Sequence, residues 1–187
     1  MTVRVMLISP AMSTALRAAR FDDESGLEAG GVDAARAAAG ALQGAGLVLA
    51  SPSARCRQTA EALGLTAAAE APAGWAMGSW RGRTLDEVAA EQPEAVAAWL
   101  SDPAAAPHGG ESLAALCARV GGWLDALADG GPRALAVVEP EVVRAAALHA
   151  LGGPPAAFWR LDVPPLTATA LSGRAGRWNL RLGADLA

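Results

Sequence analysis

The sequence predicts a single α/β domain over residues 1–187, with a mostly parallel central sheet flanked by helices and an antiparallel edge added late in the chain. Two observations lead to this fold class. Short apolar runs rich in β-branched residues, typical of buried central strands, occur at residues 3–9, Leu47–Ala50 and 134–138. Each run is later followed by a segment whose apolar residues recur at helical spacing, which is the alternation that a parallel sheet needs.

The first half of the chain supplies two of these helices and a long loop. Residues 30–44 form the first predicted helix, and Gly44 and Gly46 end it. The second helix begins just beyond Pro52. Proline and glycine become frequent between residues 71 and 82, which predicts an ordered loop that contains Trp75 and Trp80.

The second half continues the pattern and closes it with a hairpin. Two short helices are predicted at 85–90 and 94–100, a long amphipathic helix at 111–127, and a helix after the third strand at 141–151. The remaining apolar segments FWRLDV, LTATALSG and RWNLRL lie around the turn SGRAG, which favours a β-hairpin.

Composition excludes several classes of protein. The formal net charge is −4, and a nucleic-acid-binding protein needs the opposite sign. Lysine and tyrosine are absent, which excludes a Schiff-base lysine, a P-loop lysine and a tyrosine proton donor. The two isolated cysteines, Cys56 and Cys117, indicate a reduced cytosolic setting and no disulfide framework. We expect no metal, no cofactor, no membrane segment and a cytoplasmic location.

Four segments occur in an order that resembles one family. They are SPSARCRQTA at 51–60, MGSWRGRT at 77–84, HGGES at 108–112 and VVRA at 142–145. Together they resemble the histidine phosphatase superfamily over nearly the whole chain. The resemblance implies a phosphoglycerate mutase-like fold, a three-layer sandwich around a mostly parallel sheet.

The residues of the family's reaction do not carry over. Family members carry Arg-His-Gly after the first strand, where the histidine accepts the phosphoryl group; here Ser9 stands at the arginine position and Pro10 at the nucleophile. Proline offers neither a nucleophilic atom nor a backbone N–H. When Arg144 is aligned with the family's arginine, the second catalytic histidine falls on Glu139, and no carboxylate stands near residues 74–76 for the proton donor. The resemblance therefore implies a divergent member that lacks both catalytic histidines and keeps Arg55.

Glu139 and Arg55 are the candidate catalytic residues. A carboxylate at the end of a buried strand is placed where desolvation raises its pKa toward the range useful for proton transfer, and Arg55 is suited to orient an anionic group. The alternative is that Glu139 only pairs with Arg55 or caps the helix that follows, a geometry that Pro140 favours.

Five further residues are candidates for substrate binding, and each has a structural alternative. Ser9 and Pro10 end the first strand, where ligands bind in open α/β sheets, but such a serine also serves the local backbone. Trp75, which matches no family tryptophan, is suited to line an apolar cavity or to anchor its loop. His108 precedes two glycines and reaches either the pocket rim or a surface loop. Glu111 starts the long helix and either contacts a ligand or pairs with the helix dipole.

Two hypotheses follow. The first is a repurposed enzyme without phosphatase activity, which performs isomerisation, dehydration, cyclisation or hydrolysis on a small organic substrate with Glu139 and Arg55, in bacterial specialised metabolism. The second is a catalytically inactive pseudophosphatase that binds a ligand or regulates. An ordinary phosphatase fits the family but lacks its nucleophile, because Pro10 stands at that position. The expected partner is a small molecule, and the sequence does not settle the oligomeric state.

Overall fold

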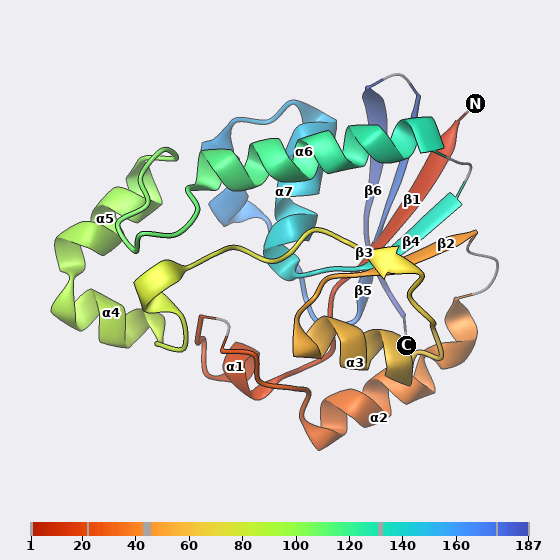
Figure 1. Cartoon of the computed structure of the whole chain (residues 1–187), viewed down its shortest axis with the longest axis horizontal. Helices are drawn as coiled ribbons and strands as arrows, with labels where there is room; N and C mark the ends of the chain where they lie inside the picture. The colour runs from red at the N-terminus through yellow and green to blue at the C-terminus, as the bar shows by residue number, and fades with distance from the viewer. Residues whose placement is uncertain (1, 22, 43–45, 131–132, 175, 187) are drawn as a thin grey trace.

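A six-stranded mixed sheet forms the centre of the protein in the order β3-β2-β4-β1-β5-β6 (Figure 1). The computed structural model describes residues 2–21, 23–42, 46–130, 133–174 and 176–186. The strands are β1 (Val3–Ile8), β2 (Leu47–Ala50), β3 (Ala69–Glu70), β4 (Arg133–Val137), β5 (Thr167–Arg174) and β6 (Arg177–Asp185). The first four pair in parallel, whereas β5 is antiparallel to β1 and β6 is antiparallel to β5. This arrangement confirms the predicted fold class, including its antiparallel edge.

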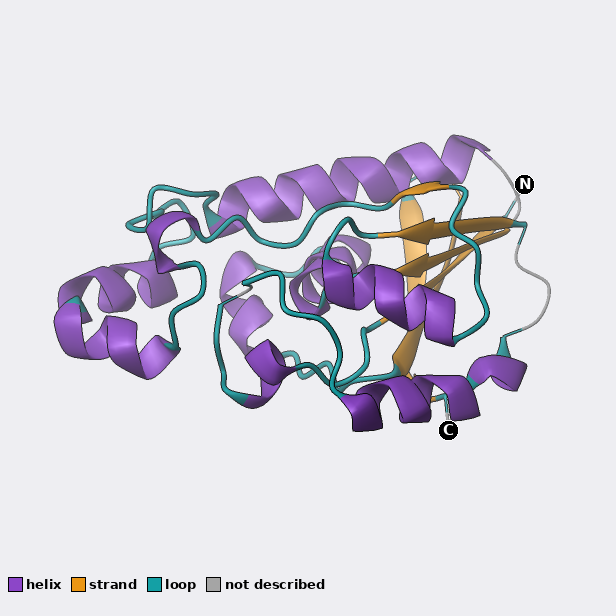
Figure 2. Cartoon of the chain, turned by 60° about the horizontal axis from the view of Figure 1, so that its bottom comes forward, coloured by secondary structure: helices purple, strands orange, loops and turns teal. Residues whose placement is uncertain are grey.

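Helices cover both faces of the sheet and extend beyond one end (Figure 2). They are α1 (Thr14–Arg17), α2 (Ala29–Ala37), α3 (Ala54–Ala62), α4 (Leu85–Glu91), α5 (Pro93–Ser101), α6 (Leu113–Gly130) and α7 (Pro140–Leu151), with 3-10 turns η1 (Ala39–Ala41), η2 (Gly78–Trp80) and η3 (Pro155–Arg160). α6 and α7 pack on one face, α2 and α3 lie on the other, and α4 and α5 stand away from the sheet.

Two apolar clusters hold these layers together. On one face Leu7 of β1 packs in a cluster with Leu116 and Leu124 of α6. On the other face Ile8 of β1 packs with Ala35 of α2 and with residues of α3. Because successive side chains of a strand point to opposite faces, the continuous apolar run of β1 serves both layers.

Several predicted boundaries need correction. The first helix ends at Ala37 and continues only as η1; its predicted end at Gly44, like Ala175 in the predicted turn, lies outside the described residues. The FWRLDV segment is not a strand: it begins within η3 and continues as an irregular connection, because Phe158 packs into the core from a 3-10 turn. The long helix starts at Leu113, since the hydroxyl of Ser112 accepts a hydrogen bond from the Ala115 N–H (3.2 Å) and caps it there.

The carboxyl ends of the three central parallel strands meet at one edge of the sheet. The N–H of Ser51 donates to the carbonyl of Val137, and the N–H of Val138 donates to the carbonyl of Ile8, both at 2.9 Å. The segments that follow β1, β2 and β4 therefore lie side by side. In the described part of the chain, no helix combines the length and apolarity needed to cross a membrane.

Candidate functional site

Glu139 and Arg55 meet in a buried ion pair at this edge. Arg55 lies in the first turn of α3, which begins after β2, and Glu139 follows β4 as the N-cap residue of α7. Both Nε and Nη2 of Arg55 lie 2.7 Å from Oε2 of Glu139. The two residues are 6% and 1% exposed. The two candidate catalytic side chains are therefore in direct contact.

The environment of Glu139 favours a protonated carboxyl near neutral pH. Burial, followed by repulsion from the Glu141 carboxylate, raises the pKa of Glu139 to about 7, against the attraction of Arg55 and an interaction with the Ser53 hydroxyl, which lower it. Oε1 is buried and has no hydrogen-bond partner among the described residues. Glu139 makes no side-chain capping bond to α7, so the capping role that we considered is not what holds it.

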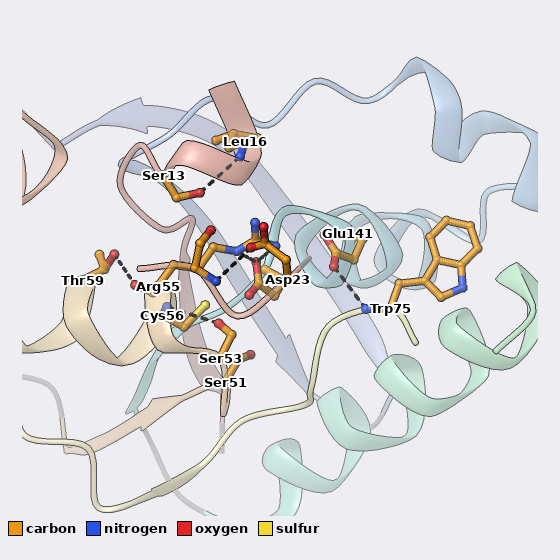
Figure 3. A network of polar contacts seen from close by, with 12 residues as sticks. Ser13, Leu16, Asp23, Ser51, Ser53, Arg55, Cys56, Thr59, Trp75 and Glu141 are labelled. Atoms are coloured by element: carbon orange, nitrogen blue, oxygen red, sulfur yellow. Dashed lines mark hydrogen bonds and ion pairs between the residues drawn. The ribbon is translucent and has the colours of Figure 1, made fainter. Parts of the chain in front are cut away.

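Ser53 and Cys56 belong to the same surroundings (Figure 3). The Ser53 hydroxyl caps α3 by accepting a hydrogen bond from the Cys56 N–H at 3.2 Å. Burial, and then the charge of Glu139, raise the pKa of the Cys56 thiol well above its ordinary value. The thiol is therefore protonated and behaves as a small apolar group beside the ion pair.

A cleft of about 500 Å³ lies next to the pair. Its lining includes Glu24, Ser53, Gly74, Trp75, Arg81 and Glu141. Neither Glu139 nor Arg55 is among the described residues that line it, because Gly74 and Ser53 stand between. A Cβ atom at Gly74 would come within 2.9 Å of Cγ of Glu139 and 2.8 Å of Oε1 of Glu141, so only glycine lets the loop lie this close.

Trp75 has both of the roles considered in the sequence analysis, since it lines the cleft and anchors its loop. It lines the cleft, and it also packs in an aromatic cluster with Trp99, Phe158 and Trp159 at centroid distances of 5.3 to 5.9 Å. Its backbone N–H donates to Oε1 of Glu141 at 3.1 Å, as Figure 3 shows, and its indole N–H donates to the carbonyl of Glu111 at 2.7 Å. The ring is thus fixed rather than free to follow a ligand.

His108 and Glu111 lie behind the cleft wall, and the described lining includes neither. The ring of His108 is buried against Trp80 at a centroid distance of 5.1 Å, and its Nδ1 accepts from the Gly110 N–H at 3.0 Å. Burial lowers the pKa of His108, which makes the ring neutral at pH 7. Both carboxylate oxygens of Glu111 accept hydrogen bonds from Arg119 at 2.8 Å, and Arg119 also donates to the carbonyls of 73 and 74.

Ser9 and Pro10 are joined to the start of β5. The Ser9 hydroxyl donates to the carbonyl of Pro164 at 2.6 Å and accepts from the Thr167 N–H at 3.0 Å. The carbonyl of Pro10 accepts from the Leu166 N–H at 3.4 Å. In this structure the two residues connect strands and do not line the cleft described above.

Sequence reasoning missed three residues of the site: Ser53, Gly74 and Glu141. Ser53 carried a recognisable signal as a helix-capping serine two residues before Arg55. Glu141 was readable as a second carboxylate two positions from Glu139 in the first turn of a helix. Gly74 carried none, because its role depends on the approach of a distant loop.

The comparisons with known proteins agree with this fold. The family model of the histidine phosphatase superfamily (branch 1) matches residues 14–185, and the chain belongs to that superfamily. A mycobacterial glucosyl-3-phosphoglycerate phosphatase in complex with VO3 is similar in structure, with a TM-score of 0.84, 26% identity, and 96% of this chain and 98% of that chain covered.

Two other solved structures share the fold. One is mycobacterial hydrolase 1, with a TM-score of 0.82, 24% identity, and 97% of this chain and 98% of that chain covered. The other is a phosphoserine phosphatase mutant from Entamoeba histolytica in complex with phosphoserine, with a TM-score of 0.82, 17% identity and 98% of each chain covered. No curated protein matches the chain.

Proposed function

We propose that this protein is an enzyme that uses the histidine phosphatase scaffold without a phosphohistidine, and that Glu139 acts as general acid or base on a small neutral or cationic organic molecule. The reaction is an isomerisation, dehydration, cyclisation or hydrolysis. The observation that carries the proposal is the Glu139 carboxyl itself: it is buried beside the cleft, Arg55 holds one of its oxygens, and its other oxygen has no partner among the described residues. Proton transfer is what such a group is suited to perform.

The charges around the cleft support a substrate that is not a phosphate dianion. Glu24, Arg81 and Glu141 line the cleft, and Glu24 is paired with Arg81. Glu139 lies just beneath it, against Gly74. Arg55, the arginine of the family motif, is bonded to Glu139. A dianion approaching the Glu141 carboxylate meets repulsion, whereas a neutral or cationic molecule does not. The family-model match also begins at Thr14, after the Ser9 and Pro10 positions.

A route for the proton supports the same role. Ser53 lines the cleft, and its hydroxyl lowers the pKa of Glu139. A hydroxyl both donates and accepts, so Ser53 is placed to pass a proton between a molecule in the cleft and the carboxyl below. In this mechanism Arg55 fixes Oε2 and thereby leaves the proton at Oε1. Removal of the Ser53 hydroxyl would break this route and also remove the cap of α3.

A second candidate is a ligand-binding protein without a reaction. It is favoured by the burial of Glu139, which is 1% exposed, and by its two bonds from Arg55, features that a purely structural ion pair also shows. In that case the cleft binds a molecule, and Glu139 stabilises the chain segments below it.

The test combines a phosphatase assay with a search for turnover. We expect the purified protein to release no p-nitrophenol from p-nitrophenyl phosphate. The protein is also incubated with a panel of neutral and cationic small molecules, and products are followed by mass spectrometry. A product formed by the wild type should be lost by about 10²- to 10⁴-fold in Glu139→Gln and kept in the matched control Glu61→Gln, an exposed residue of α3.

Two results speak against the proposal. Hydrolysis of p-nitrophenyl phosphate that disappears in Arg55→Ala would show that the site is still a phosphatase. A molecule that binds in the cleft, is recovered unchanged, and binds less tightly to Glu139→Gln would favour the second candidate.

A further inference from the structure

β1 and β4 begin at the same end of the sheet (Figure 1). A second concave surface lies there, at the opposite end of the sheet from the cleft. We call it the basic groove and define it by Arg4, Met6, Leu42, Arg133, Leu135 and Arg181. Its volume is about 430 Å³, which lies within the range of small-molecule sites. The candidate site follows the last residues of these strands, so the two places share no lining residue.

Strand register explains how the groove is built. Arg4 pairs with Arg133 of β4 on one side and with Ser172 of β5 on the other. Two residues further along β1, Met6 pairs with Leu135 and with Ala170, and Ala170 pairs with Arg181 of β6. Because residues two apart in a strand share a face, a polar row and an apolar row lie next to each other on the same face.

The two rows have different chemical characters. Met6, Leu135 and Ala170 form an apolar floor, to which Leu42 adds a side wall. Arg4, Arg133 and Arg181 border this floor with guanidinium groups, and Ser172 and Asn179 add neutral polar groups. The described lining therefore combines a flat apolar surface with hydrogen-bond donors along its edge.

The charge of the groove is opposite to that of the whole chain. The described residues that line it include three arginines and no aspartate or glutamate, although the chain carries a net charge of −4. Arg174 of β5 and Arg177 of β6 are opposite each other in the strand register at the hairpin end. Strand alternation places both on the face of the sheet that holds the groove, whereas Trp178 points to the other face.

We propose that the basic groove binds a small organic anion, a phosphate or carboxylate attached to an apolar body. Arg4 and Arg181, whose Cα atoms lie in adjacent rows of the sheet, hold the anionic group, since guanidinium groups bind both phosphate and carboxylate with paired hydrogen bonds. The apolar body lies on Met6 and Leu135. This site is separate from the cleft, and it stands whether or not the proposed reaction is correct.

The experiment uses naphthalene-1-phosphonate and 1-naphthoate, two anions that cannot be hydrolysed as phosphate esters, and 1-naphthalenemethanol as the neutral analogue. Binding to the whole protein is measured by calorimetry at low and moderate salt. We expect both anions to bind, the neutral analogue to bind at least about tenfold more weakly, and added NaCl to weaken only the anions. The Arg4→Gln/Arg181→Gln double variant should lose at least about tenfold in affinity for the anions.

The matched control is Arg36→Gln/Arg160→Gln, which removes the same charge from two exposed residues outside the groove and should keep the affinity within about twofold. If the double variant does not fold, the single variants and the salt dependence of the wild type provide the same test. Equal affinity in both double variants, equal binding of the neutral analogue, or no binding of either anion at millimolar concentration would overturn the proposal. So would binding of a single-stranded oligonucleotide or of phosphatidylserine vesicles in place of the small anions, because these are different partners.

Discussion

At the scale of single residues, Glu139 is the group on which the site depends. Its carboxyl forms an ion pair with the buried Arg55. The effect of burial, which raises the pKa of Glu139, outweighs the attraction of Arg55, which lowers it. A protonated Glu139 beside a charged Arg55 is therefore a state that the folded protein occupies near neutral pH. The unfolded chain ionises the same carboxyl at an ordinary pKa, which links stability to pH.

This linkage predicts that the contribution of Glu139 to the free energy of unfolding falls as pH rises. Because the folded pKa of about 7 is above the ordinary pKa of 4.5, the stabilising contribution is complete below pH 4.5 and is lost as pH rises through 7. The free energy of unfolding of the wild type, relative to Glu139→Gln, should fall by up to about 3 kcal/mol over this window. Urea denaturation at several pH values measures it. Glu61→Gln is measured alongside as the matched control, and a flat difference for Glu139→Gln would contradict the raised pKa.

Gly74 gives a second residue-scale prediction. Gly74→Ala inserts a Cβ atom within 3 Å of both Glu139 and Glu141, so the loop must move. We expect it to lower the free energy of unfolding by about 1–3 kcal/mol. Gly30→Ala, in the first turn of α2 with nothing within 4 Å, is the matched substitution and should be neutral or stabilising by up to about 1 kcal/mol. Equal effects at both positions would mean that the approach at Gly74 is not tight.

At the scale of elements, capping residues decide where the helices of the site begin. Ser53 starts α3 and so sets the direction of Arg55, and Ser112 starts α6 and leaves Glu111 outside the helix to pair with Arg119. The helix dipole role that the sequence suggested for Glu111 therefore gives way to an ion pair. That pair also ties α6 to the loop that forms the cleft wall.

The capping box of α4 allows the contribution of a helix cap to stability to be measured away from the site. The Thr84 hydroxyl accepts from the Glu87 N–H at 3.1 Å, and the Glu87 carboxylate accepts from the Thr84 N–H at 2.8 Å. Thr84→Ala should cost about 1 kcal/mol in thermal or chemical denaturation. Ser101→Ala, which removes a hydroxyl bonded within α5, should cost less. The opposite order would show that α4 does not depend on its cap.

The sequence predicted most elements because their apolar patterns are local. The Leu47–Ala50 strand and the helices after Pro52 and Pro140 were found with boundaries correct to within a few residues. β3 was missed, since its two residues are exposed and carry no apolar pattern. The convergence of Arg55 and Glu139 followed from adjacent strand ends, but the depth of Glu139 did not, because its cover comes from Gly74 in a separate loop.

At the scale of the whole molecule, the sheet separates two regions of different charge. Glu24, Glu141 and Arg81 line the cleft beyond the carboxyl ends of the central strands, whereas the described lining of the groove at their amino ends holds arginines and no acidic side chain. This separation is invisible in the net charge of −4, which averages over both. It follows from the parallel arrangement of β1, β2 and β4, which collects all like ends on one side.

The same sheet predicts an order of local stability. β1 is hydrogen-bonded to β4 and β5 and is covered on both faces, so its amides should exchange with deuterium last. β3, a two-residue edge strand with exposed side chains, should exchange among the first of the strands. Hydrogen exchange followed by mass spectrometry resolves the two. Faster exchange in β1 than in β6 would contradict the arrangement.

The position of Cys56 has a practical consequence. Its thiol lies at 0% exposure next to Glu139, whereas Cys117 of α6 is only half-buried. A thiol reagent in solution can modify Cys56 only after the start of α3 has moved away from the Glu139 carboxyl. The rate at which Cys56 is modified therefore reports how often the ion pair opens. In a Cys117→Ser background, Cys56 is the one cysteine of the sequence that can react. A molecule that reaches Glu139 from the cleft would change the rate of Cys56 modification, and a molecule that stops at the outer wall would leave it unchanged.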